Sequence, residues 1–168
     1  FGIKNVWLDA REFIITDDNY LSGKPNLAMI KERVNKIVAP YTQAGQLVLT
    51  QGFIARTLQG EAATLGREGS DCTATLLGMA LAAEEVEIWT DVDGMMTADP
   101  RYIKNSRVID MLSFKEAEAM AYFGAKVLHP RTIEPARLAG IPVRVLNSKN
   151  SAHPGTLILE RAADSGAK

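Results

Sequence analysis

Residues 66–83, GREGSDCTATLLGMALAA, constrain the fold more than any other stretch of the chain. Glycine, serine and aspartate precede an apolar, alanine-rich run, and this pattern predicts a helix with one buried face. We expect Ser70 or Asp71 to cap its first turn and Gly69 to take an unusual backbone conformation. The amino end of such a helix can bind a small anion, although an ordinary capped helix explains the stretch equally well.

Short apolar runs alternate with amphipathic segments around this helix. We expect an amphipathic helix over residues 27–41, buried strands over 46–50 and 86–90, and a hairpin over 53–65. Alternating strands and helices are typical of the α/β class. The sequence therefore predicts an α/β fold with a mostly parallel sheet.

The second half of the chain continues the alternation. Ser113 and Glu116 have the spacing of a capping box at the start of a helix. A further helix is expected to begin at His129, to which we give a structural role. Apolar runs at 142–146 and 156–159 predict two more strands.

Composition excludes several classes of function. Lysine and arginine total 19 against 20 acidic residues, so we expect no nucleic-acid partner. No apolar run approaches the length of a membrane span and no secretory signal is visible, so we expect no membrane association. The single cysteine, Cys72, excludes an internal disulfide framework and fits the cytoplasm; we expect it to be a small buried residue. The two histidines are far apart, which argues against a transition-metal site.

Arg67 is the first candidate binding residue. Its guanidinium presents a planar fork that matches a carboxylate. Asp71 on the same helix start can accept a hydrogen bond from an ammonium group, so the pair suits a zwitterion such as a free amino acid. The alternative is that Asp71 only caps the helix, while Arg67 pairs with Glu68 or Glu61 at the surface.

Residues 90–101 form the second candidate region. Thr90 and Asp91 at a strand end can hydrogen-bond a ribose or a base edge, and Arg101 can reach a phosphate. A solvated acidic loop is the alternative reading, and the spacing lacks the later ligands of a calcium-binding loop. Lys126 is a third candidate, either as a phosphate contact or as a solvated lysine.

Ligands of open α/β sheets bind beyond the carboxyl ends of the strands. The strands at 46–50 and 86–90 both end in polar or glycine-rich residues, and the helix at 66–83 begins between them in the sequence. We therefore expect Arg67 and Asp91 to face one crevice.

TLGREGSD at 64–71, WTDVDGMMTADPR at 89–101 and FGAKVLHP at 123–130 follow one another in a specific order and spacing. Together with QGFIA at 51–55 and SKNSAHPGTLI at 148–158, these motifs resemble the aspartate kinases of the amino-acid kinase superfamily. Each motif alone is modest, but the ordered set is specific and covers nearly the whole chain.

The resemblance implies a role for nine residues. The residues that would hold the aspartate substrate are Phe53, Arg67, Ser70 and Asp71. Those that would contact ATP are Thr90, Asp91, Met96, Arg101 and Lys126. Three positions depart from the family's habit: Glu68 replaces a frequent glycine, and Cys72 and Met96 replace frequent tyrosines.

The resemblance also implies the fold and its extent. We expect the carboxyl-terminal portion of a three-layer α/β/α sandwich, with a partial catalytic domain at 1–160 and a disordered tail at 161–168. The family's catalytic lysine lies in a Lys-Phe-Gly-Gly motif that we expect upstream of residue 1, so no catalytic residue is assigned. The regulatory domains of the family are expected after about residue 159.

The implied activity is phosphoryl transfer from ATP to the side-chain carboxylate of L-aspartate, the first step of lysine, threonine and methionine biosynthesis. The implied cofactors are ATP and Mg²⁺, and the implied assembly is a homodimer. Because the catalytic lysine is expected upstream, we predict that this chain alone is nearly inactive. Two alternatives stay open: a nucleotide or amino-acid binding module without catalysis, and a related kinase with another acceptor.

Overall fold

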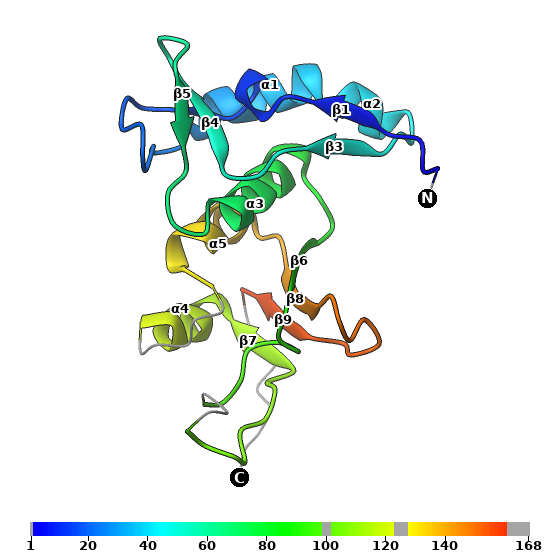
Figure 1. Ribbon diagram of the computed structural model, residues 1–168, viewed down its shortest axis with the longest axis vertical. Coiled ribbons are helices and arrows are strands. Elements are labelled where there is room, and N and C mark those ends of the chain that lie inside the picture. The colour runs from blue at the N-terminus through cyan, green and yellow to red at the C-terminus, as the bar shows by residue number, and fades with distance from the viewer. Residues whose placement is uncertain (1, 99–101, 123–127, 161–168) are drawn as a thin grey trace. The chain divides into compact units, whose positions relative to one another are not determined.

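The computed structural model describes residues 2–98, 102–122 and 128–160. The chain divides into two compact units, Phe1–Ala83 and Glu84–Lys168 (Figure 1). The expected tail at 161–168 lies outside the described residues, and the expected domain at 1–160 stays a prediction.

The described residues of the first unit form short strands, paired in both directions, and three α-helices. Its elements are β1 (Val6–Leu8), the 3-10 helix η1 (Ala10–Glu12), β2 (Ile15–Thr16), α1 (Leu27–Ile37), α2 (Ala39–Gln43), β3 (Val48–Thr50), β4 (Ile54–Thr57), β5 (Ala62–Thr64) and α3 (Gly69–Leu81). Strand β1 pairs in parallel with β3, while β2, β4 and β5 form a second sheet. The antiparallel β4–β5 pair confirms the predicted hairpin.

The core of the first unit lies between α1, α3 and the strands. Phe13, Ile30, Val34 and Leu76 are fully buried in it. Cys72 joins the same cluster, which confirms its expected role as a small buried residue. The apolar face predicted for α3 is therefore the face that holds this unit together.

The predicted helix over 27–41 is wrong in its extent. Helix α1 ends at Ile37, and the separate short helix α2 starts at Ala39. Pro40 lies in the first turn of α2, where its missing N–H is not needed. The proline thus starts a second helix instead of ending a single one.

The strand predicted at 46–50 is shorter than expected and is not buried. Strand β3 spans Val48–Thr50, and Leu49 is 54% exposed. Successive side chains of a strand point to opposite faces, so Val48 packs on the core while Leu49 does not. Trp7, the partner of Leu49 on β1, is likewise exposed.

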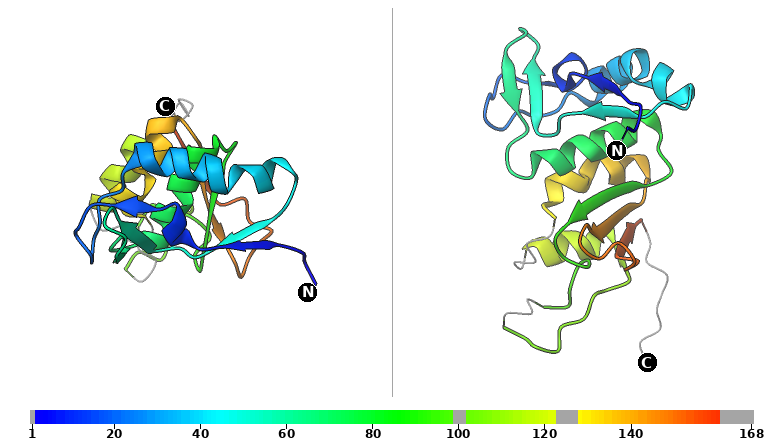
Figure 2. Two further views of the ribbon diagram at one scale, coloured as in Figure 1. Left: turned by 90° about the horizontal axis from the view of Figure 1, so that it is seen from above. Right: turned by 45° about the vertical axis from the view of Figure 1, so that its right-hand side comes forward.

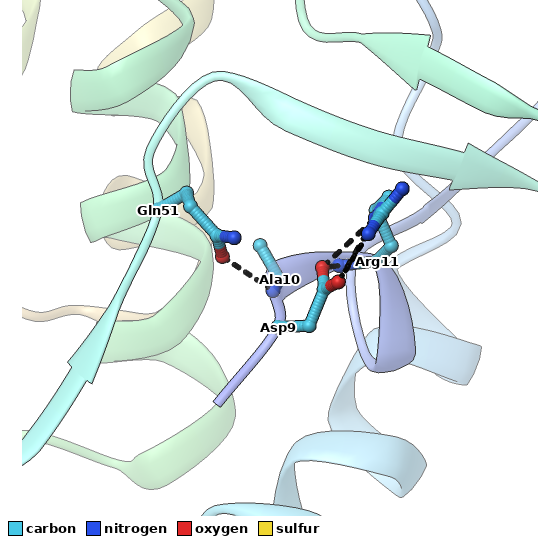
Figure 3. Close-up of polar contacts among 4 residues, drawn as sticks. All are labelled: Asp9, Ala10, Arg11 and Gln51. Carbon is cyan, nitrogen blue, oxygen red and sulfur yellow. Dashed lines mark hydrogen bonds and ion pairs between the residues drawn. The ribbon is translucent and has the colours of Figure 1, made fainter. Parts of the chain in front are cut away.

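Polar contacts join the carboxyl ends of β1 and β3 (Figure 3). Gln51 Oε1 accepts the N–H of Ala10 at 2.9 Å. The Arg11 guanidinium pairs with the Asp9 carboxylate, and this hydrogen bond lowers the pKa of Asp9. Asp9 also accepts the N–H of Arg11, which caps η1. These bonds fix the strand ends from which the Gly52–Phe53 turn departs.

The described residues of the second unit form a four-stranded sheet and two helices. Its elements are β6 (Val86–Thr90), β7 (Met111–Ser113), α4 (Phe114–Tyr122), α5 (Pro130–Ala139), β8 (Val143–Asn147) and β9 (Thr156–Leu159). The strand order is β6-β8-β9-β7. Figure 2 shows β6 and β8 side by side, and these two strands are parallel. Strand β7 runs parallel to β9, while β8 and β9 are antiparallel.

Local signals placed both helices of the second unit correctly. Glu116 accepts hydrogen bonds from the N–H and Oγ of Ser113, and Ser113 Oγ accepts the N–H of Glu116, which confirms the capping box. His129 caps α5 by accepting the N–H of Arg131, in agreement with its expected structural role.

The predicted α/β class is confirmed, with four parallel and two antiparallel strand pairings in the described chain. Within the residues described, no helix has the length and apolar character needed to cross a bilayer.

Candidate functional site

A pocket of about 600 Å³ opens in the first unit at the amino end of α3. Its lining comes from the segment between β2 and α1, the turn after β3, strand β5, and the residues that enter and begin α3. The lining residues are Leu21, Phe53, Thr64, Gly66, Arg67, Glu68, Gly69 and Ser70. Three of the four residues predicted to bind aspartate therefore lie around one pocket. The fourth, Asp71, follows directly in the sequence but does not line it.

The start of α3 differs from the prediction. The helix begins at Gly69, and Ser70 and Asp71 lie inside its first turn, so neither is the cap. The residue at the cap is Glu68, with a left-handed φ of 53° and no side-chain hydrogen bond to the helix end. The unusual backbone expected at Gly69 thus falls on Glu68 instead. The first N–H groups of α3 consequently receive no capping side chain from Glu68.

Phe53 is a second non-glycine residue with a left-handed backbone, with φ 73°. Its ring lies against the start of α3, because a Cβ added at Gly69 would stand 2.7 Å from Phe53 Cδ2. A Cβ at Gly52 would stand 2.9 Å from the Cα of Ser70. The turn after β3 and the first turn of α3 therefore approach as closely as glycine allows. Strained residues of this kind cluster at binding sites.

Charges of both signs lie at this pocket. The Arg67 side chain is 77% exposed, and its Nε stands 3.9 Å from Glu68 Oε1. This contact agrees with the surface-pair alternative but leaves most of the guanidinium open to a ligand. Burial raises the pKa of Asp71, and the neighbouring carboxylate of Glu68 raises it further. Asp71 forms no ion pair with any described residue, so a cationic group of a ligand would offset both effects.

The second unit carries the loop that follows β6. The carbonyl oxygen of Thr90 accepts hydrogen bonds from the N–H and Oγ of Ser148, at 2.8 and 2.9 Å. Thr90 Oγ1 lies 3.4 Å from Asp91 Oδ1, and the Asp91 side chain is exposed. The backbone at the end of β6 is thus fixed, while the side chain of Asp91 is open to a ligand.

Asp93 anchors this loop. Its Oδ1 accepts hydrogen bonds from Asn147 Nδ2 at 2.8 Å and from Asn150 Nδ2 at 3.0 Å. These bonds lower the pKa of Asp93, with the Asn147 bond contributing most. The carboxylate of Asp93 thus joins the loop after β6 to the last residue of β8 and to the loop that follows it.

Thr156 holds the middle of the same loop. Its buried Oγ1 accepts the N–H of Met95 at 2.8 Å and donates to the carbonyl of Ile109 at 2.7 Å. Gly94 packs so closely that an added Cβ would stand 2.4 Å from that oxygen. Met96 bridges to Val108 in an antiparallel arrangement. Arg101 and Lys126, predicted to contact ATP, lie outside the described residues.

Four polar residues that organise these loops were not predicted from the sequence. They are Thr73, Asn147, Asn150 and Thr156. The hydrogen bonds that join them to the two loops span between 20 and 61 positions along the chain, so no local pattern signals these contacts. The described part of the chain also holds no group of three or more acidic, histidine or cysteine side chains able to bind a metal.

Two curated relatives of this chain are an aspartokinase and a bifunctional enzyme that contains one. The chain is 45% identical over 159 residues to the lysine-sensitive aspartokinase 3 of Escherichia coli K12, covering 95% of this chain and 35% of that protein. It is 39% identical to a chloroplastic bifunctional aspartokinase/homoserine dehydrogenase of Arabidopsis thaliana, covering 97% of this chain and 18% of that protein. The chain thus spans about a third or less of these relatives.

Solved structures agree with the sequence comparison. A crystal structure of E. coli aspartokinase III in complex with aspartate and ADP matches with a TM-score of 0.90 and 42% identity. The match covers 96% of this chain and 36% of that one. The profile of the amino acid kinase family matches residues 1–147. The chain therefore belongs to the amino acid kinase family.

Proposed function

We propose that this chain serves phosphoryl transfer from ATP to the side-chain carboxylate of L-aspartate, giving 4-phospho-aspartate and ADP. The observation that carries the proposal is the pocket that gathers Phe53, Arg67 and Ser70 at the start of α3. The similarity to an aspartokinase crystallised with aspartate and ADP supports the choice of both ligands.

The charges at the pocket suit both the α-carboxylate and the ammonium group of an amino acid. The exposed guanidinium of Arg67 can pair with the α-carboxylate through two parallel hydrogen bonds. The carboxylates of Asp71 and Glu68 make the electrostatic potential near the helix start more negative, which would stabilise an ammonium group there. Held in this way, the substrate would direct its side-chain carboxylate toward the phosphoryl donor.

We assign the nucleotide to the loop after β6, with Thr90, Asp91 and Met96 as contacts and Arg101 and Lys126 as phosphate partners. The support is the fixed backbone of the loop, which presents the exposed Asp91 side chain. A carboxylate nucleophile is already ionised, so positioning and charge stabilisation carry the reaction and no strong base is needed.

ATP would act as its Mg²⁺ complex. The described residues offer no three-residue metal cluster, and Mg²⁺ commonly keeps waters and binds through substrate phosphates with one or two carboxylates. We therefore expect the ion to arrive with the nucleotide, where it would neutralise phosphate charge.

The first test is calorimetry on this chain with L-aspartate and with ATP. We expect L-aspartate to bind and Arg67→Ala to weaken its binding by about 100-fold, because a charged double hydrogen bond is lost. ATP binding should be unchanged by Arg67→Ala and weakened by Asp91→Ala. Equal affinity of the wild-type chain for L-glutamate, N-acetyl-L-glutamate and L-aspartate would contradict the proposed acceptor.

A second candidate is binding without turnover by this chain alone. The observation that favours it is the share of the relatives that the chain spans, 35% of the E. coli enzyme. A coupled assay for ADP release tests this candidate, since rapid turnover by the isolated chain would exclude a pure binding module.

Assembly and location are also proposals. A homodimer follows from the resemblance and a cytoplasmic location fits the single cysteine, while some plant relatives are named as chloroplastic. Light scattering on the purified protein would test the dimer directly.

A further inference from the structure

Thr73 connects α3 to the turn that carries Phe53. The residue lies in α3 and is 3% exposed. Its Oγ1 accepts the backbone N–H of Phe53 at 3.0 Å and donates to the carbonyl oxygen of Gly69 at 2.9 Å. One hydroxyl group therefore joins the first turn of α3 to a segment 20 residues earlier in the chain.

The Phe53 turn needs such a contact. A phenylalanine with φ 73° occupies a sparsely populated region, at a cost of about 1–3 kcal/mol that the surrounding structure must offset. The carbonyl of Phe53 accepts the N–H of Leu65 at 2.9 Å, and its N–H donates to Thr73. Both backbone polar groups of Phe53 are thus hydrogen-bonded. The carbonyl is bonded to Leu65, directly after β5, and the N–H is bonded to α3.

The hydrogen bond from Thr73 to the Gly69 carbonyl alone would not distinguish Thr73 from other threonines in helices. A threonine inside a helix commonly donates to the carbonyl four residues earlier. The hydrogen bond accepted from Phe53 is different, because it comes from another segment and fixes where the Phe53 ring stands. That ring packs against Gly69 and, with Arg67 and Ser70, lines the pocket.

We propose that Thr73 is a positioning residue for the amino-acid pocket: its hydroxyl sets the Phe53 turn against α3 and thereby the shape of the pocket. The inference rests on the proposed function only for the identity of the ligand. The hydrogen bond and the placement of Phe53 can be tested without any ligand.

The test compares Thr73→Val, Thr73→Ser and a matched control in the full chain. Valine keeps the shape of threonine but removes the hydroxyl, while serine keeps it. Thr57→Val is the control, since Thr57 is a buried threonine of the same unit whose Oγ1 accepts the N–H of Glu61 at the hairpin turn. Amide hydrogen exchange of Phe53 reports the bond, and calorimetry reports affinity for L-aspartate.

We expect the Phe53 amide to exchange about tenfold faster or more in Thr73→Val, because its N–H loses its acceptor. L-Aspartate should bind about tenfold more weakly in that variant, with ATP affinity unchanged. Thr73→Ser should restore both values, and Thr57→Val should leave both as in the wild type despite any loss of thermal stability.

The two proposals fail in different ways. Unchanged Phe53 exchange in Thr73→Val, or equal losses in Thr57→Val, would overturn the positioning role. If the wild-type chain bound no L-aspartate, the proposed function would fail, while the exchange data would still decide whether Thr73 holds the turn.

Discussion

The two loops that we assign to ligands are held by the same kind of bond but differ in the residues that take unusual backbone conformations. In the first unit, Thr73 accepts the N–H of Phe53; in the second, Thr156 accepts the N–H of Met95. Each buried hydroxyl also donates to a carbonyl oxygen. Around the pocket of the first unit, the turn after β3 and the segment entering α3 place Phe53 and Glu68 at positive φ beside Gly66, whereas the residue with positive φ in the second loop is Gly94.

The unusual backbone of the first unit lies at the pocket, whereas that of the second unit lies in the interior of its fold. Phe53 and Glu68 both line the pocket and carry side chains at positions where glycine would be less strained. Gly94 faces the interior, where no side chain fits. The two units also differ in the pKa of a carboxylate. Burial raises the pKa of Asp71, whereas hydrogen bonds from amide groups lower the pKa of Asp93. Three variants and one pH titration would sharpen or break this comparison.

Gly94→Ala should have the largest effect. A Cβ there would meet Thr156 Oγ1 at 2.4 Å, and the backbone has φ 146°. We expect the second unit to lose about 3 kcal/mol of stability by urea unfolding. Gly140→Ala is the control, since Gly140 also has positive φ but open space, and should cost about 1 kcal/mol. Equal losses would show that steric contact with Thr156 is unimportant.

Thr156→Val should have the second-largest effect on stability. It removes the acceptor of the Met95 N–H inside the second unit and should cost about 2 kcal/mol. ATP affinity should fall while L-aspartate affinity stays unchanged, the reverse of Thr73→Val. Thr97→Val removes an exposed hydroxyl that accepts the N–H of Arg107, and should change stability by no more than about 0.5 kcal/mol. A loss of L-aspartate affinity in Thr156→Val would break the distinction between the loops.

Glu68→Gly should stabilise the first unit. Glycine adopts the left-handed conformation without strain, so we expect a gain of about 1 kcal/mol in thermal unfolding. Ala82→Gly is the control, because Ala82 has a similar φ of 51° at the other end of α3. Both variants should be more stable, but only Glu68→Gly should alter L-aspartate affinity. A stability loss in Glu68→Gly would show that the Glu68 side chain supports the fold.

The smallest expected effect is the change of stability with pH. The pKa of Asp93 is lowered in the folded chain, so its stabilising bonds are present above the ordinary carboxyl range and are lost as pH falls through the folded pKa. Asp71 has the opposite sign, because its pKa is raised: its contribution favours the folded chain at low pH and is lost as pH rises through the folded pKa.

Carboxyl signals followed by NMR between about pH 6 and about pH 2 would check both directions. The side-chain amide signals of Asn147 and Asn150 should shift with the titration of Asp93, and Asp93→Asn should abolish that shift. A lower pKa for Asp71 than for Asp93 would contradict the comparison.

Much of this protein follows from the sequence by itself. Local signals placed the hairpin between β4 and β5, the capping box of Ser113 and Glu116, and the cap of α5 at His129, because each depends on residues a few positions apart. The ordered motifs also indicated the family. The resemblance that they carry predicted a binding role for Phe53, Arg67 and Ser70, all of which line the pocket.

Tertiary structure decided the rest. The left-handed backbone of Glu68, the exposed side of β3 and the partners of Thr73, Asp93 and Thr156 all depend on segments far apart in the sequence. A hydroxyl or carboxylate has no preferred distant partner until packing brings one within hydrogen-bonding distance. Local patterns therefore locate helices and turns, whereas close packing determines which polar groups hold the two loops in place.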